Sequence, residues 1–326
     1  MGDQDFSPVR RSQTCYANVR ETFDVAAQMA VRCISKVADA YKLDTKRLRI
    51  FAPLGAIAYD ARILSFNRTK QEISIWTLDE RQSIPFVCGD RQRALLHAQR
   101  GETDLALVNG EWYLFAVCEV ETPEPIDVEG VLGIDMGVTN IAVDSDGEIH
   151  PGTAIKNIRY RHRSLRNKLQ RKRTHGSRRR LRKLAGQEYR FATWVNHNLS
   201  KRIVAKAEGT KRAIAVEDLT HIRTRVTARR SQRATLHSWA FAQLRDFITY
   251  KAQLRGVPVH AIDPRNTSRT CPSCSCTDKR NRTTQASFVC ISCGFAGPAD
   301  VIAAGNIASR ARVSAPYYPD ADSSAD

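Results

Sequence analysis

The chain has 326 residues, with 51 Lys and Arg against 34 Asp and Glu, so its formal net charge is +17. This length fits one large domain or two to three smaller ones. Apolar residues make up 42% of the chain, which excludes disorder throughout. No apolar run reaches the roughly 18 residues of a membrane span, and no signal-type block opens the sequence. We therefore expect a cytosolic protein with no membrane partner.

The positive charge is concentrated in one part of the chain. Between residues 149 and 187 there are 14 Lys and Arg and no acidic residue. An excess of this kind favours a polyanionic partner. A ribosomal protein or a membrane-surface protein can have the same composition, so charge by itself favours nucleic acid only as a class.

In the N-terminal third, the apolar pattern changes from helical to strand-like. Residues 11–42 contain no Pro or Gly and predict one helix. Residues 46–127 predict a small antiparallel β-domain, interrupted by a short helix near 91–100. Asn109-Gly110 marks a hairpin turn within it. The expected strands include residues 49–51, 73–76, 84–87 and 112–115.

Residues 122–127, with the sequence Thr-Pro-Glu-Pro-Ile-Asp, predict a stiff linker and a domain boundary. Beyond it the pattern indicates a strand, a hairpin, long basic helices, a strand, a helix, a strand and a cysteine cluster. That order is typical of a mixed α/β domain. Residues 313–326 predict a disordered acidic tail.

Three carboxylates stand at the ends of predicted elements. Asp135 and Glu217 each end an apolar strand, and Asp300 opens an apolar helix. Each position also has an ordinary explanation, such as helix capping by Asp300. Together, three carboxylates could converge to bind hard divalent cations, and two such ions about 4 Å apart support in-line phosphodiester cleavage. A basic chain would supply the phosphate-binding surface for this chemistry.

Five of the nine cysteines crowd into a short segment. Cys271, Cys274, Cys290 and Cys293 form two C-x-x-C pairs, which predict one tetrahedral, structural zinc ion. All four ligands would come from the protein, so the metal has no open position for water. Cys276 is expected to be a free thiol. The scattered cysteines are expected to be small buried side chains; these are Cys15, Cys33, Cys88 and Cys118.

The basic stretch predicts helices with one packed stripe, because Leu165/Leu169 and Leu181/Leu184 lie at helical spacings. The remaining side chains would contact phosphates, which gives affinity and salt dependence but no sequence choice. His197, His237 and His260 are expected to pack or hydrogen-bond and not to act as bases. The candidate nucleic-acid-binding residues are Arg161, Arg163, Arg166, Lys168, Arg171, Lys172, Arg173, Arg178, Arg179, Arg180, Arg182, Lys183, Arg223, Arg225, Arg229 and Arg230.

Several motifs together resemble the TnpB family of transposon-encoded, RNA-guided nucleases, relatives of the compact type V CRISPR effectors. The resemblance is specific from about Gly133 to Ile307. The matching motifs are Gly-Ile-Asp-Met-Gly-Val at 133–138, Val-Glu-Asp-Leu at 216–219, Leu-His-Ser-Trp-Ala-Phe at 236–241, Asp-Pro-Arg-Asn-Thr-Ser at 263–268 and Asp-x-x-Ala-Ala-x-Asn-Ile at 300–307.

The resemblance implies a RuvC-like (RNase H-type) mixed sheet with an inserted zinc ribbon, preceded by a short helical segment and an antiparallel β-barrel wedge domain. The implied domains are a helical recognition segment at 1–45, the wedge at 46–127, the nuclease domain at 128–260, the zinc ribbon at 261–297, the final helix of the nuclease domain at 298–312 and the tail at 313–326.

The resemblance also implies roles for the candidate residues. Asp135, Glu217 and Asp300 would be the catalytic triad that holds two Mg²⁺ ions, beside one structural Zn²⁺. A guide RNA from the transposon end would pair with the DNA target, double-stranded before it is opened and single-stranded after. The protein would work in the bacterial or archaeal cytoplasm, at the nucleoid.

Two other functions stay open at this point. One is a non-cleaving DNA- or RNA-binding protein that acts as a repressor or transposition accessory. The other is a structure-specific nuclease that needs no guide. The presence of all three carboxylates favours an enzyme.

Overall fold

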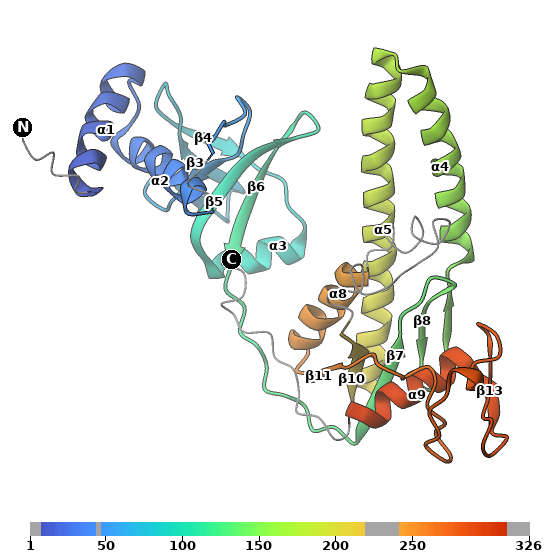
Figure 1. The fold of residues 1–326 in the computed structure, drawn as a ribbon. Helices are drawn as coiled ribbons and strands as arrows, with labels where there is room; N and C mark the ends of the chain where they lie inside the picture. The colour runs from blue at the N-terminus through green and yellow to red at the C-terminus, as the bar shows by residue number, and fades with distance from the viewer. Residues whose placement is uncertain (1–7, 44–46, 219–240, 312–326) are drawn as a thin grey trace, which may run out of the picture. The chain divides into compact units, whose positions relative to one another are not determined.

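The computed structural model describes residues 8–43, 47–218 and 241–311 (Figure 1). Its contacts divide the chain into two compact units, and the division falls between Glu121 and Thr122. The predicted tail and the arginines at 223–230 lie outside the described residues. Within the described part of the chain, no helix combines the length and the apolar character needed to cross a bilayer.

Two helices, and not the single predicted one, open the first unit. They are α1 (Pro8–Phe23) and α2 (Ala27–Leu43). The chain turns between them at Asp24, whose φ is 48° and whose N–H donates to the carbonyl of Arg20 at 3.0 Å. Asp tolerates this left-handed conformation because its short polar side chain can bond locally. The absence of Pro and Gly therefore did not ensure an unbroken helix.

The β-block of the first unit is antiparallel, as predicted. It consists of two three-stranded sheets, ordered β1-β5-β6 and β2-β3-β4. Asn109 and Gly110 have φ of 56° and 92°, which confirms the hairpin between β5 and β6. The strands are β1 (Ile57–Tyr59), β2 (Leu64–Asn67), β3 (Glu72–Trp76), β4 (Arg81–Pro85), β5 (Gln99–Val108) and β6 (Glu111–Cys118).

The two sheets share one apolar cluster, in which Tyr59, Ile73 and Ile75 are buried. A helix, α3 (Asp90–Leu95), lies near the predicted place. The strand predicted at 49–51 is wrong: Ile50 is 90% exposed and the first strand begins at Ile57. Among the described residues, no pairing joins the two sheets into a closed barrel. The wedge barrel therefore stays a prediction.

The second unit has the predicted mixed α/β architecture. Its five-stranded sheet has the order β11-β10-β7-β8-β9, with β7, β10 and β11 parallel and the other pairs antiparallel. The strands are β7 (Gly130–Asp135), β8 (Asn140–Asp144), β9 (Ile149–Pro151), β10 (Arg212–Glu217) and β11 (Val259–Ile262). The helices are α4 (Thr153–Lys172), α5 (His175–Gly209), α8 (Phe241–Gln253) and α9 (Ala299–Ala311).

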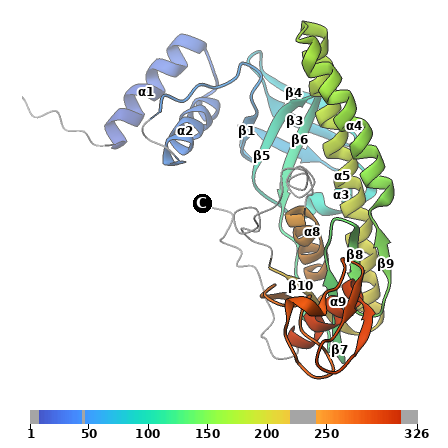
Figure 2. The same ribbon diagram turned by 45° about the vertical axis from the view of Figure 1, so that its right-hand side comes forward.

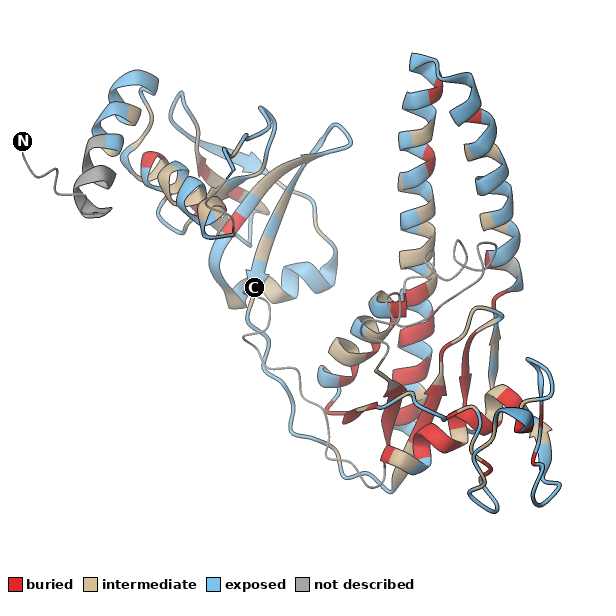
Figure 3. Cartoon of the chain, in the orientation of Figure 1, coloured by how far each residue is buried: buried red, intermediate tan, exposed pale blue. Residues whose placement is uncertain are grey.

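Helices cover both faces of this sheet, which is the most buried part of the unit (Figure 3). Successive residues of a strand point to opposite faces. Leu132 and Ile134 of β7 therefore pack in the cluster that includes α5 and α8, whereas Val131 packs with Ile307 of α9. Because both faces are covered, β7 and β10 are nearly continuous apolar runs, and they end in Asp135 and Glu217.

Gly133 allows α9 to approach β7 closely. A Cβ at this position would lie 2.0 Å from the carbonyl oxygen of Ala304 and 2.6 Å from the amide nitrogen of Ala308. Only glycine leaves room for a helix backbone at this distance. The resulting contact brings the first turn of α9 to the C-terminal end of β7, and the two are seen side by side in Figures 1 and 2.

The basic segment forms a helical hairpin, α4 and α5, that extends away from the sheet (Figure 1). Leu169 and Leu184 are buried between its helices, which confirms the predicted packing stripe. Arg173 takes a left-handed φ of 51° at the turn. Thr174 then caps α5, because its hydroxyl accepts a hydrogen bond from the N–H of Ser177 at 3.2 Å.

Candidate functional site: three carboxylates beside a cysteine cluster

The sheet brings two of the predicted carboxylates side by side. In the parallel β7–β10 pair, Ile134 lies opposite Val216, and the following residues, Asp135 and Glu217, end the two strands. Asp300 lies in the first turn of α9, which packs on β7. The three carboxylates therefore meet at the C-terminal edge of the parallel strands, where ligands bind in open α/β sheets.

The electrostatics of Asp135 reflect this proximity. Burial is the main cause that raises its pKa from 3.8 to about 7, and the charges of Glu217 and Asp300 raise it further. Burial also raises the pKa of Glu217, although a hydrogen bond from Thr267 and the charges of Arg310 and Arg282 oppose the shift. Buried like charges of this kind are costly without a counter-charge.

Three polar side chains hold these carboxylates, and the sequence motifs assign no role to any of them. The hydroxyl of Thr267 donates to Oε1 of Glu217 at 2.5 Å. Asp300 accepts from Nη2 of Arg282 at 3.0 Å and from Nδ2 of Asn140 at 2.9 Å. Asn140 begins the strand that follows Asp135, so its position in the sequence could have identified it as a neighbour of the site. Arg282 lies between the two cysteine pairs, and only the tertiary structure places it here.

The donor set suits a hard divalent cation, because it consists of carboxylate oxygens. In the described chain, the four cysteines are the one group of three or more candidate metal ligands whose ligand atoms all lie within 4.8 Å.

The cysteine cluster has the geometry expected for zinc. Sγ of Cys271 lies 3.6 Å from that of Cys293, and Sγ of Cys274 lies 3.5 Å from that of Cys290. Tetrahedral Zn–S bonds of about 2.3 Å put sulfur atoms roughly 3.8 Å apart. Backbone N–H groups, that of Cys293 first, lower the pKa of Cys290, which favours the thiolate that binds metal. The N–H of Phe295 lowers the pKa of Cys293, but hydrogen bonds with the other three cysteines raise it overall, so the four thiols share their protons.

The ribbon around the cysteines is held by a buried side chain. Asn281 is fully buried; its Nδ2 donates to the carbonyls of Arg269 and Cys276, and its Oδ1 accepts from the N–H of Ile291. The two remaining strands, β12 (Ser287–Val289) and β13 (Ala296–Pro298), form an antiparallel pair here. Outside the ribbon, the prediction of buried thiols fails for Cys15 and Cys33, which are exposed.

The predicted nucleic-acid-binding residues of the hairpin are almost all exposed. The exception is Arg166, which is half-buried and pairs with Glu188 of α5, so part of its charge is used within the hairpin. The exposed ones are Arg161, Arg163, Lys168, Arg171, Lys172, Arg173, Arg178, Arg179, Arg180, Arg182 and Lys183.

Of the three candidate histidines, the two that the structure describes form no hydrogen bond or ion pair with the three carboxylates. His197 stacks on Phe247 with ring centroids 4.0 Å apart. His260 is buried within β11. His237 lies outside the described residues. These positions agree with packing roles.

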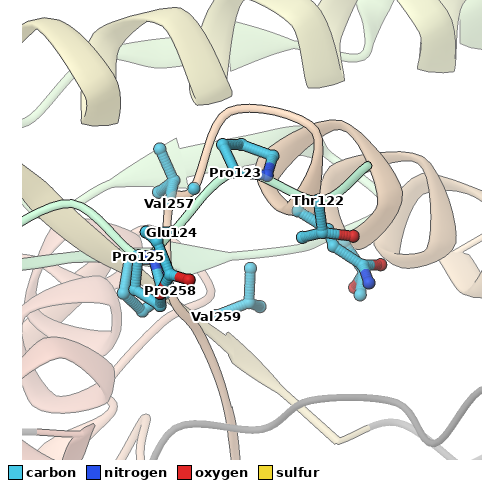
Figure 4. A pocket seen from close by; sticks show the side chains of 10 residues that line it. Thr122, Pro123, Glu124, Pro125, Val257, Pro258 and Val259 are labelled. Carbon is cyan, nitrogen blue, oxygen red and sulfur yellow. The ribbon is translucent and has the colours of Figure 1, made fainter. Parts of the chain in front are cut away.

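A pocket of about 250 Å³ lies elsewhere in the second unit, between residues 122–125 and the segment 256–259 (Figure 4). Proline and valine make up half of its lining residues, including Pro123, Pro125 and Val257. Val259 begins β11, so the pocket is at the opposite end of the strands from the carboxylates. It is therefore separate from the candidate site.

Two family models match the second unit. Residues 115–223 match a model described as probable transposase, and residues 241–307 match one described as Cas12f1-like, TNB domain. These matches contain all three carboxylates and all four clustered cysteines.

Curated relatives extend these matches. A TnpB-like protein of Methanocaldococcus jannaschii is 30% identical over 200 residues, which cover 58% of this chain and 71% of that protein. The CRISPR-associated endodeoxyribonuclease Cas12f1 of Sulfoacidibacillus thermotolerans is 34% identical over 218 residues, which cover 61% of this chain and only 50% of that protein. The chain belongs to the TnpB-like family.

A solved structure supports the fold. Cas12f1 in a complex with sgRNA and target DNA matches with a TM-score of 0.62 and 18% identity, over 94% of this chain and 76% of that one. A third curated relative, the putative RNA-guided DNA endonuclease InsQ of Escherichia coli, is 26% identical over 215 residues, which cover 61% of this chain and 53% of that protein.

Proposed function

We propose that this chain is an RNA-guided, metal-dependent DNA endonuclease. The names of its relatives support this class, since they include an endodeoxyribonuclease and a putative RNA-guided DNA endonuclease. The observation that carries the proposal is the convergence of Asp135, Glu217 and Asp300 at one edge of the sheet. In this proposal, residues 128–260 and 298–312 form a RuvC-like nuclease domain, 261–297 the zinc ribbon and 46–127 the wedge.

The three carboxylates would hold two Mg²⁺ ions. When bound, such ions activate the attacking water and stabilise the leaving oxygen of a phosphodiester. Burial and the charges of Glu217 and Asp300 raise the pKa of Asp135 to about 7, so cation binding near neutral pH would displace a proton from it. Thr267 and Asn140 fix the directions of Glu217 and Asp300.

Arg282 would help to receive the substrate. Its guanidinium donates to Asp300 and stands beside Asp135 and Glu217, where it opposes the rise in both pKa values. A guanidinium matches the geometry of phosphate oxygens as well as that of carboxylates. A scissile phosphate beside the triad would therefore contact the guanidinium of Arg282, which the fold already holds there.

The guide and the target would be held mainly through their backbones. The hairpin α4–α5 presents exposed Arg and Lys side chains, which neutralise phosphates and give affinity without sequence choice. Base pairing between guide and target would supply the sequence choice. The zinc would support folding, since all four of its positions are taken by cysteines.

A non-cleaving repressor or transposition accessory protein would need no carboxylate cluster. The presence of all three carboxylates in one place favours the nuclease.

The proposal is tested by cleavage of a DNA target in the presence of a guide RNA transcribed from the transposon end. We expect Mg²⁺-dependent cutting by the natural chain and none by Asp135→Ala, while the affinity of that variant for RNA and DNA is retained. Glu129→Ala is the matched control, since Glu129 is an exposed carboxylate outside the triad that pairs with Lys211.

Residual cutting by Asp135→Ala, or cutting that EDTA does not stop, would refute the assignment of the triad. Omission of the guide RNA separates the guided nuclease from a structure-specific one: a guided enzyme loses cleavage, whereas the other keeps it.

A further inference from the structure

Glu217 is held by a segment of the chain of which only Thr267 has a role in the mechanism above. This segment, loop 263–270, follows β11 and leads directly to Cys271. Its Thr267 is 2% exposed, and the hydroxyl donates to Oε1 of Glu217 at 2.5 Å. A weaker alternative acceptor, the carbonyl of Pro264, lies at 3.1 Å. A hydrogen bond to one carboxylate oxygen fixes the rotation of the group, and so the direction of the other oxygen.

Helix α9 fixes the loop in turn. Asn306 is 8% exposed, and its Nδ2 donates to the carbonyls of Thr267 and Thr270, both at 2.8 Å. Arg310, one turn further along, donates to the carbonyls of Asp263 and Arg265 at 2.9 and 2.7 Å. Two side chains of one helix thus hold four carbonyls of the loop.

The same helix carries Asp300 in its first turn. One rigid element therefore supplies one carboxylate of the triad and also anchors the loop that orients another. A metal site needs the relative positions of its ligands fixed to within a fraction of an ångström, and hydrogen bonds behind the ligands do this in many proteins.

We propose that Thr267 and Asn306 form a positioning relay for the metal site, in which Asn306 fixes the loop backbone and Thr267 fixes the carboxylate of Glu217. Both are positioning residues, since they act through Glu217. The inference rests on the proposed function, because it assumes that Glu217 binds a divalent cation.

The relay predicts a specific ranking of variants at one position. Thr267→Val keeps the shape of the side chain but removes the hydroxyl, and we expect it to weaken Mn²⁺ binding by the guide-free protein about tenfold to a hundredfold, the usual range for the loss of such a supporting bond. Thr267→Ser keeps the hydroxyl and should stay within about threefold of the natural chain. Mn²⁺ binding is measured directly by electron paramagnetic resonance titration, without any cleavage.

Thr270→Val is the matched control. Thr270 lies in the same loop, and its exposed hydroxyl bonds to the carbonyl of Asn266 and to Thr277 but not to a carboxylate. Its variant should bind Mn²⁺ normally. Thermal unfolding of each variant, in the absence of divalent cations, establishes that the comparison is made between folded proteins.

Asn306→Leu tests the second step. If Asn306 acts through Thr267, the losses of Mn²⁺ affinity in Asn306→Leu and Thr267→Val should not add in the double variant. Full additivity would overturn the relay, as would normal Mn²⁺ binding by Thr267→Val, equal damage in Thr267→Ser, or equal damage in Thr270→Val.

Cleavage assays on the same proteins keep the two proposals apart. If the natural chain binds Mn²⁺ with the predicted ranking but does not cut guided DNA, the relay stands and the proposed endonuclease fails. If the natural chain cuts but Thr267→Val binds Mn²⁺ and cuts equally well, the endonuclease stands and the relay fails. A natural chain that binds no Mn²⁺ would refute both.

Discussion

The cysteine cluster and the carboxylate cluster both gather side chains that repel one another when ionised, yet they are built in different ways. The four cysteines come from two short turns within residues 271–293, and their sulfur atoms are already at zinc-site distances. The carboxylates come from two strands and a helix that are far apart along the chain.

This difference separates a closed site from an open one. Four sulfurs around one point leave no ligand position free, so the ion can only hold the chain together. In the proposed function, the carboxylates at the edge of the sheet would instead hold two ions beside water and a substrate phosphate. Removal of a cysteine should therefore affect folding first, and removal of a carboxylate should affect chemistry first.

The largest expected effect is the loss of the zinc ion. Cys290→Ser removes a buried ligand, and the apparent zinc-binding energy of small zinc domains is about 10 kcal/mol or more. We expect the variant to lose bound zinc and solubility together, as measured by metal analysis and thermal unfolding. Cys276→Ser, a nearby cysteine outside the cluster, is the control and should keep the metal. A zinc-free Cys290→Ser protein that folds fully would contradict the structural role.

An intermediate effect is expected on replacement of Asp135, and it is a gain of folding stability and not a loss. Its pKa is about 7 in the folded chain against 3.8 ordinarily, so between about pH 4 and 7 the folded state binds more protons than the unfolded state. Stability in EDTA should therefore fall as the pH rises through this window. Asp135→Asn removes the cost of ionising this buried carboxyl group. It should therefore raise the free energy of unfolding at pH 8 by on the order of 2–4 kcal/mol, with no gain at pH 4.

Urea unfolding at both pH values measures this effect, with Glu129→Gln as the control carboxylate. An Asn variant that gains nothing at pH 8 would show that Asp135 carries no such penalty. Stabilisation of the natural chain by Mg²⁺ at pH 8, absent in the variant, would tie the penalty to the cation site.

The smallest effect per residue is expected for the exposed Arg and Lys side chains of the hairpin, because each would contribute a single phosphate contact to nucleic-acid binding. Replacing Arg178, Arg179 and Arg180 with Gln should weaken RNA and DNA binding at all sequences alike. It should also reduce the slope of log affinity against log salt by about one for each lost phosphate contact. Fluorescence anisotropy over a salt series measures the slope. Lys211→Gln is the control, because Lys211 is exposed outside the hairpin and pairs with Glu129. An unchanged slope would place the nucleic acid elsewhere.

Local patterns predicted the elements that depend on local physics. Asn109-Gly110 forms the expected turn because both residues accept positive φ, and the leucine stripe of α4 and α5 packs as its spacing indicates. The patterns failed where local preference was weak. Asp24 interrupted a helix that contained no Pro or Gly, and residues 49–51 formed no strand although Ile50 and Phe51 are apolar.

The sequence by itself determined the ligand chemistry: four cysteines at zinc spacing, three carboxylates at the ends of apolar runs, and a basic segment without acids. Only the tertiary structure decided which other residues position these ligand groups. Gly133 admits α9 to the sheet, Arg282 reaches Asp300 from the ribbon, and Asn306 holds the loop behind Glu217. The spacing of residues along the chain determines contacts only within a turn or a C-x-x-C pair. Contacts between distant segments depend on the strand order and on how closely a helix can approach the sheet.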